Sequence, residues 1–278
     1  MKLSVSNIAW EAKDDKYIYQ KMNDLGFSGL EIAPTRIIPE APYDHIAEAE
    51  TFAEFIKTDY GFTIPSMQSI WYGIQDKMFG AEEERERLTV YTKKAIDFAE
   101  AIGCRNLVFG CPRNRAIPET EAPKTATVKA AVAQTAVSFF RELGNYAAKH
   151  HTVIAIEANP PIYHTNYINT TKEAIELIQT VNSDGFRLNL DVGTMIENNE
   201  AVSVLNGAEH LINHVHISEP GLIQIKERTL HRELAAFLRS VSYEGYVSIE
   251  TGKRNSGDST DSLNDLFRTM EYVAEIFA

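Results

Sequence analysis

The sequence predicts one α/β domain, a single (β/α)8 TIM barrel that spans residues 1–278. Two observations lead to this prediction. Strand-like and helix-like segments alternate along the chain eight times, with short connections between them. The chain of 278 residues also exceeds the roughly 250 residues of such a barrel only slightly, and no linker rich in Pro, Gly or Ser divides it. An open doubly-wound sheet is the alternative, but it would not gather eight strand ends around one centre.

Each expected strand is a short apolar run, and each expected helix follows such a run. The strands are expected at residues 3–8, 29–33, 64–70, 106–110, 153–158, 186–192, 214–218 and 246–251. The helices are expected at residues 14–24, 44–59, 81–102, 127–149, 171–181, 199–207, 229–241 and 261–277. Gly26, Gly103 and Gly245 stand where helices should stop, and residues 169–171 offer an N-cap to the helix that follows them. This alternation predicts a parallel sheet with right-handed crossovers.

Charge and composition exclude several kinds of partner. The formal net charge of −12 argues against nucleic acid, because phosphate binding normally needs a basic surface. No apolar run approaches the roughly 20 residues that span a bilayer, and the N-terminus lacks the apolar core of a signal peptide. The two cysteines, Cys104 and Cys111, suggest neither a disulfide framework nor a metal motif. We therefore expect a cytoplasmic protein with no nucleic-acid or membrane partner.

Four strand-like segments in the second half of the chain end on residue types that bind metal ions. These residues are Glu157, Asp191, His216 and Glu250. Because side chains alternate faces along a strand, each of the four lies on the face opposite to the aliphatic side chains of its own strand. In a barrel the aliphatic face packs on helices, and the carboxyl ends of the strands meet around the site. We therefore expect the four side chains to form one cluster.

Three carboxylates and one imidazole suit one divalent ion, either Mn²⁺, Co²⁺, Mg²⁺ or Zn²⁺. The alternative for Glu157 or Glu250 taken singly is a bond to backbone groups at the strand mouth. For all four residues together that alternative is disfavoured, because carboxylates crowded without a cation are costly.

Along its whole length the chain resembles the xylose-isomerase-like TIM barrel superfamily, which contains sugar phosphate isomerases and epimerases. The resemblance is strongest in residues 153–252, in the stretches EANPP, YINTTKEA, DVGT, HVHISE and GYVSIE. It implies that the four strand-end residues are metal ligands, and that Glu157 and Glu250 also transfer protons. It further implies a metal-dependent sugar or sugar phosphate isomerase or epimerase that acts through an enediolate, with no organic cofactor.

Two positions depart from the family pattern. Thr194 stands where family members often carry a substrate-binding histidine, and Leu222 stands where ketose 3-epimerases often carry an arginine. His231, Arg228 or Lys226 could supply a substitute polar contact. For His231, a place near the start of the following helix is an equally good interpretation.

Polar residues near other strand ends are candidates for binding the substrate. The candidates are Glu31, Gln68, Arg113, Asn159, Thr194 and His231. Glu31 should point into the barrel, where it could bond a sugar hydroxyl or pair with an arginine. Arg113 and Arg115 could grip a phosphate or carboxylate, or they could lie in a solvated loop. His214 lies one inward step deeper than His216 and is expected to support it rather than to bind metal.

Three other functions remain open from the sequence. A dehydratase acting on an inosose or a hydroxy acid would use the same metal and enediolate chemistry. An apurinic-site endonuclease shares this barrel, but it would use additional histidines on the early strands, where this chain has none. Thr194 and Leu222 also allow a non-catalytic barrel that binds metal and sugar. A small sugar is the expected partner, and loop aromatics such as Trp71, Tyr72 and Tyr163 could serve a lid or a homo-oligomer contact.

Overall fold

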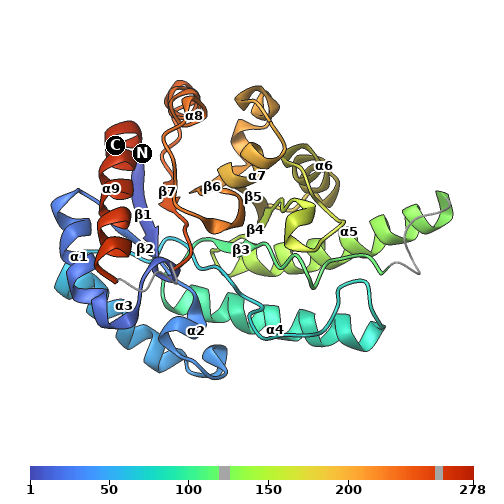
Figure 1. Cartoon of the computed structure of the whole chain (residues 1–278). Coiled ribbons are helices and arrows are strands. Elements are labelled where there is room, and N and C mark those ends of the chain that lie inside the picture. Colours follow the sequence, from blue (N-terminus) through green and yellow to red (C-terminus); the bar gives the residue numbers. More distant parts are fainter. Residues whose placement is uncertain (119–125, 254–258) are drawn as a thin grey trace.

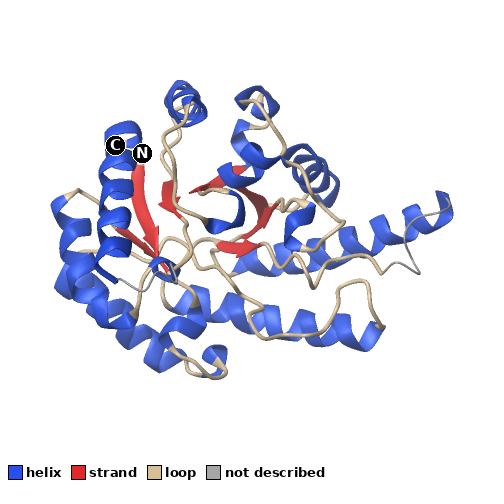
Figure 2. Ribbon diagram, viewed as in Figure 1, coloured by secondary structure: helices blue, strands red, loops and turns tan. Residues whose placement is uncertain are grey.

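The computed structural model describes residues 1–118, 126–253 and 259–278. In these residues, seven parallel strands form one curved sheet, and helices surround its outer side (Figures 1 and 2). The strands are β1 (Lys2–Ser6), β2 (Gly29–Glu31), β3 (Leu107–Phe109), β4 (Ile154–Glu157), β5 (Phe186–Asp191), β6 (Ile212–Ile217) and β7 (Tyr246–Ile249). Their order in the sheet is β2-β1-β7-β6-β5-β4-β3. The α/β barrel expected from the sequence is confirmed.

The expected strand at residues 64–70 is not a regular strand. Its Met67 instead forms single parallel bridges with Ile32 after β2 and with Leu107 of β3. Pro65 has no N–H to donate to a ladder, and Ser69 has a left-handed φ of 55°, so extended pairing is interrupted at both residues. The segment still donates and accepts backbone hydrogen bonds on both sides. It therefore fills the gap between β2 and β3 and closes the barrel.

The helices lie close to where the sequence predicts them, with one exception. They are α1 (Asp15–Asp24), α2 (Pro34–Ile37), α3 (Ile46–Tyr60), α4 (Glu82–Ala101), α5 (Ala126–Lys149), α6 (Thr171–Val181), α7 (Val192–Glu197), α8 (Thr229–Ser240) and α9 (Ser259–Phe277). The prediction of a helix at 199–207 is wrong. Helix α7 begins earlier, because the Asp191 side chain caps it by accepting from the N–H groups of Gly193 and Thr194. Two short 3-10 turns, Val202–Leu205 and Glu209–Leu211, follow it before β6.

The aliphatic faces of the strands pack outward against the helices, as the alternation of side chains predicts. Ile154 and Ile156 of β4 are fully buried in the main hydrophobic cluster. Phe140 of α5 stacks on Phe186 of β5, with ring centroids 4.8 Å apart. A Cβ on Gly185 would lie 2.0 Å from the Gly144 carbonyl oxygen of α5, so this helix can approach β5 only because the position is glycine.

Local signals also hold at other helix ends. The Thr170 hydroxyl accepts from the Glu173 N–H, and the Glu173 carboxylate accepts from the Thr170 N–H, so α6 begins with a capping box. Helix α9 lies beside β1, which brings the two chain ends together (Figure 1).

None of the helices among the described residues is long and apolar enough to cross a membrane.

Candidate metal centre

The structure brings together the four strand-end residues that the sequence singles out. These residues, called the quartet here, are Glu157, Asp191, His216 and Glu250. Strand register explains the cluster, because Asp191 of β5 lies directly opposite His216 of β6. Glu157 ends β4 on one side of this pair, and Glu250 follows β7 on the other. One ligand atom from each of the four lies within 4.8 Å of the others.

The quartet lies at the bottom of a cavity of about 160 Å³, called the inner cavity here. Its three carboxylates line the cavity and are only 7–8 % exposed, whereas His216 is fully buried behind them. An ion held by these four side chains would therefore face the cavity on one side. That arrangement is typical of a catalytic metal site, which keeps a coordination position open for substrate or water.

The His216 ring is oriented by contacts on both of its nitrogens. Nδ1 lies 3.1 Å from Glu157 Oε1 and 3.2 Å from Glu250 Oε2, and Nε2 lies 2.9 Å from Glu31 Oε2. Burial by itself would lower the pKa of His216, but Glu31 and Glu250 raise it well above its ordinary value. An ion would have to displace the Nδ1 proton while Nε2 still donates to Glu31, so this carboxylate selects the ligating nitrogen.

Glu31, which the sequence suggests as a substrate contact, lies beneath the quartet and does not line the inner cavity. Its side chain is fully buried, and Oε2 lies 3.0 Å from His214 Nε2 as well as close to His216. Gln68 Nε2 donates to Oε1 at 3.3 Å. Burial alone would raise the pKa of Glu31, but His216 and His214 hold it well below its ordinary value. Glu31 therefore pairs with histidines, and neither a sugar hydroxyl nor an arginine reaches it.

Asp191 is fixed by the start of α7. Its Oδ2 accepts from the Thr194 N–H at 2.8 Å and lies 2.9 Å from the Thr194 hydroxyl, while Ser218 donates to Oδ1. Burial, together with the charge of Glu157, raises the pKa of Asp191 to about 6. The sequence suggests Thr194 as a substrate contact. In the structure Thr194 is fully buried, and its side chain contacts Asp191 instead. A Cβ on Gly193 would lie 2.6 Å from Ser218 Oγ, so a larger residue here would displace the hydroxyl that donates to Asp191.

Glu157 is held by two asparagine amides. Asn159 Nδ2 donates to Oε2 at 2.9 Å, and Asn189 Nδ2 donates to Oε1 at 2.8 Å. Asn159 in turn accepts from the fully buried Arg115, whose guanidinium also donates to the carbonyls of loop residues such as Ile168. Arg115 therefore supports the loops and is not available to grip a phosphate. Asn159 does line the inner cavity, as expected for a substrate contact.

Glu250 has a different environment. Among the described residues, its side chain contacts His216 at 3.2 Å, and no amide or hydroxyl donates to it. Burial raises the pKa of Glu250 to about 7, although His216 acts in the opposite direction. A carboxyl group with this pKa can both take and give a proton near neutral pH.

Of the two other expected substrate contacts, Gln68 lines the inner cavity and His231 does not. Gln68 lines the inner cavity and donates to the Ser6 hydroxyl at 2.8 Å. His231 does not line it, because this residue is buried in α8 with Nδ1 3.0 Å from the Tyr272 hydroxyl of α9. Burial lowers the pKa of His231 to about 4.

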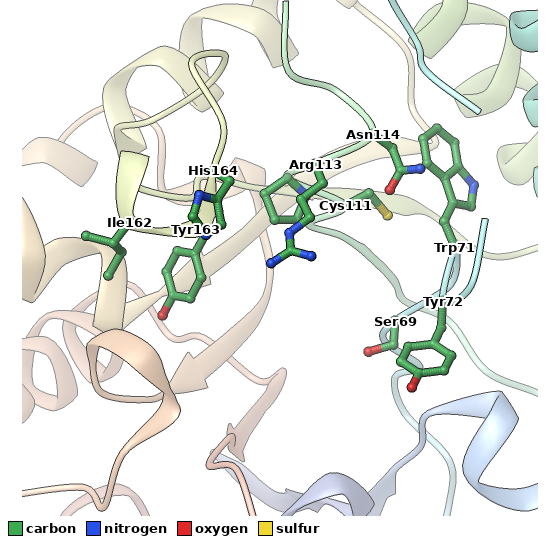
Figure 3. Close-up of a pocket in the computed structure, with 10 residues that line it drawn as sticks. Ser69, Trp71, Tyr72, Cys111, Arg113, Asn114, Ile162, Tyr163 and His164 are labelled. Atoms are coloured by element: carbon green, nitrogen blue, oxygen red, sulfur yellow. The ribbon is translucent and has the colours of Figure 1, made fainter. Parts of the chain in front are cut away.

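The side chains expected to substitute for an arginine do not reach the inner cavity either. Arg228 forms an ion pair with the buried Glu219 at 2.5 Å, and Lys226 does not line the cavity. Leu222 does line it, so this part of the wall is apolar. The remaining candidate, Arg113, lies on the wall of a neighbouring cavity (Figure 3).

Sequence reasoning missed three supporting residues. Asn189 and Ser218 lie two positions from Asp191 and His216, so the same alternation of side chains could have placed them on the inner face. Tyr163 carries no such signal. Its hydroxyl accepts from the Gly221 N–H at 2.8 Å and joins the loop after β4 to the loop after β6 beside the inner cavity.

Known proteins share this architecture. The D-psicose 3-epimerase of Clostridium cellulolyticum H10, solved with D-tagatose, superposes with a TM-score of 0.79 at 18% identity, over 100% of this chain and 99% of that one. The 3-keto-D-glucoside 4-epimerase of E. coli gives a TM-score of 0.72 at 21% identity, over 97% and 99% of the two chains. A family 2 AP endonuclease from Brucella melitensis gives 0.70 at 20% identity, over 95% and 97%.

At these identities the structural likeness establishes the fold alone, and no curated protein sequence matches the chain. The family comparison reaches further, because residues 19–272 match the family described as xylose isomerase-like TIM barrel. Since the match covers most of the chain, the protein belongs to the xylose isomerase-like TIM barrel family.

Proposed function

We propose that the protein is a metal-dependent isomerase or epimerase of a sugar or sugar phosphate, acting through an enediolate. The observation that carries this proposal is the convergence of three carboxylates and one oriented imidazole on a cavity at the carboxyl ends of the strands. Family membership supports it, as does the fold shared with two sugar epimerases, which act on D-psicose and on a 3-keto-D-glucoside.

The donor set fits one divalent ion. Carboxylate oxygens with one imidazole nitrogen suit Mn²⁺, Co²⁺, Mg²⁺ or Zn²⁺. The raised pKa values of Asp191 and Glu250 reflect burial and crowded negative charge, which a cation would relieve. A bound ion would polarise a substrate carbonyl and hydroxyl, acidify the adjacent C–H bond and stabilise the enediolate.

Glu157 and Glu250 are the proposed proton carriers. They flank Asp191 and His216 along the curved sheet, so a sugar held over the quartet would have one carboxylate on each side. Glu157, fixed by two amides, removes the proton from carbon. Glu250 delivers a proton to the opposite face in epimerisation, or to the neighbouring carbon or oxygen in isomerisation. No organic cofactor is needed for these steps.

The other functions are separated by their products. A dehydratase would use the same glutamates but release water. An apurinic-site endonuclease would need further metal ligands, and the second ligand-type group among the described residues, Glu31 with His214 and His216, is fully buried and shares His216. A non-catalytic barrel would bind metal and sugar without proton exchange.

The test is solvent exchange in D₂O on a panel of D-psicose, D-tagatose and D-fructose, followed by NMR with and without added Mn²⁺, Co²⁺, Mg²⁺ or Zn²⁺. We expect metal-dependent deuterium incorporation at the carbon beside the carbonyl. Glu157→Gln and Glu250→Gln should each slow it by about 10²–10⁴-fold, the usual contribution of a general acid or base. Glu48→Gln, at an exposed position of α3, is the control.

Calorimetry on the same variants separates loss of metal from loss of proton transfer. If both variants bind metal and exchange protons at the wild-type rate, the two-glutamate mechanism is wrong. Release of water would favour the dehydratase, and binding without exchange would favour the non-catalytic barrel.

A further inference from the structure

A second cavity of about 390 Å³, called the outer cavity here, adjoins the inner one. Four residues, Ser69, Cys111, Pro112 and Tyr163, line both. The walls of the outer cavity come from three loops, at residues 69–72, 111–114 and 162–164. Figure 3 shows these segments around a common space. The two cavities therefore form one continuous recess with the quartet at its inner end.

The two cavities together offer more space than a substrate of one sugar unit bound at the quartet would fill. Small-molecule sites usually have volumes of about 300–1,000 Å³. The inner cavity, at about 160 Å³, lies below that range, whereas the outer one, at about 390 Å³, lies within it. Tyr163 stands at their junction, where its bond to Gly221 fixes it between two loops. A substrate of one sugar unit would leave most of the recess unused.

The lining of the outer cavity suits a sugar ring. Tyr72 and Ile162 are large apolar side chains that are 71% and 47% exposed, and both line this cavity. The Arg113 side chain extends into the same space (Figure 3), and among the described residues it forms no ion pair or side-chain hydrogen bond. Sugar rings have apolar C–H faces and a rim of hydroxyls. The apolar side chains can pack on the ring faces, and the Arg113 guanidinium, which has several N–H donors, can donate to the hydroxyls.

A phosphate group fits this lining less well. Phosphate sites normally gather several backbone N–H groups or cations around the anion. Besides His164, Arg113 is the one basic residue in the lining of the outer cavity, and the Asn114 amide already donates to the carbonyls of Ile74 and Asp76.

We propose that the outer cavity binds a second sugar unit, joined by a glycosidic bond to the sugar that the quartet holds. This proposal rests on the proposed function and narrows its substrate class to glycosylated ketoses. Tyr72 and Ile162 cover the faces of the second ring, and Arg113 donates to its hydroxyls. The reacting carbonyl remains at the inner end, beyond Tyr163.

The experiment compares probes that share one ketose end. They are D-fructose, isomaltulose, which is fructose carrying glucose on O6, and D-fructose 6-phosphate. Solvent exchange with the metal-loaded protein gives kcat/KM for each, and calorimetry gives Kd. We expect isomaltulose to be preferred over D-fructose at least tenfold. Tyr72→Ala and Arg113→Ala should lower this ratio several-fold, whereas the control Arg105→Ala, at an exposed position outside both cavities, should not.

Each outcome decides the proposal. Equal values for isomaltulose and D-fructose, unchanged by the variants, would overturn it, while exchange on either probe would leave the proposed function standing. A preference for D-fructose 6-phosphate that Arg113→Ala abolishes would also overturn it, in favour of a phosphate site. If no probe exchanges protons, and D-psicose and D-tagatose do not exchange either, the proposed function fails. The ratio of the Kd values for isomaltulose and D-fructose, and the change in this ratio in Tyr72→Ala, then test the second-sugar site independently of the reaction.

Discussion

The two glutamates of the quartet are held in contrasting ways. Glu157, the last residue of β4, accepts from the amides of Asn159 and Asn189 at 2.9 and 2.8 Å. Glu250, just beyond β7, contacts His216 at 3.2 Å, and no other described side chain donates to it. Amide donors fix the orientation of a carboxylate, whereas burial with few donors favours its protonated form. The contrast indicates that neighbouring amides fix the orientation of Glu157, whereas His216 is the main polar contact of Glu250.

The largest expected effect concerns Glu250 in the metal-free protein. Its folded pKa of about 7 lies above the ordinary 4.5, so the stabilisation of its protonated form is complete below about pH 4.5 and is lost as pH rises through 7. Glu250→Gln stays neutral at every pH. We therefore expect this variant to match the wild type near pH 4.5 and to exceed it above pH 8 by on the order of 3 kcal/mol.

Urea unfolding in EDTA across this pH range measures the difference. Glu157→Gln is the matched comparison. Because its amide would face the two asparagine donors of Glu157, it should gain no such stability at high pH. Equal behaviour of the two variants would remove the contrast between the glutamates.

A smaller effect should follow from releasing Glu157. Asn159→Ala and Asn189→Ala each remove one amide donor that orients this carboxylate. Loss of a group that orients a metal ligand typically costs about 10–100-fold in metal affinity or activity. Calorimetric titration with Mn²⁺ measures the change, with Asn145→Ala on the exposed side of α5 as control. Wild-type affinity in both variants would mean that the amides do not position Glu157.

The smallest expected effect is at Thr194. Thr194→Val keeps the shape of the side chain and the N–H bond to Asp191, but it removes a hydroxyl that lies 2.9 Å from Asp191 and 2.7 Å from the Ala158 carbonyl. We expect a loss of about 0.5–1.5 kcal/mol in the free energy of unfolding, the usual net value of one hydrogen bond. Urea unfolding of the metal-free protein measures it. A much larger loss of turnover than of stability would instead indicate that Thr194 contacts the substrate.

Much of the fold could be predicted because its signals are local. Apolar runs alternating with amphipathic segments locate all seven regular β-strands of the described residues in nearly the right place, and the N-cap residues expected at 169–171 mark the start of α6. The predictions at 64–70 and 199–207 were wrong for local reasons that the alternation of apolar and polar residues does not reveal. Pro65 leaves the first segment with single bridges, and capping by Asp191 moves α7 forward in the chain.

The supporting contacts of the site were harder to predict. Alternation along a strand states which face a side chain occupies, but not how deep it lies along the barrel axis. Glu31 points inward as expected, yet it lies below His216, and Thr194 is turned onto Asp191. His231 of α8 contacts Tyr272 of α9, which lies 41 residues further along the sequence. A contact over that separation leaves no signal in the residues around His231.

The sequence by itself determined the barrel and the four residues of the quartet, because side-chain alternation and strand ends are properties of short segments. Only the tertiary structure decided which nitrogen of His216 faces Glu157 and Glu250, why these two glutamates differ, and that a second cavity opens from the first. These features depend on the register between strands and on loops that meet from distant parts of the chain, and no local pattern encodes either.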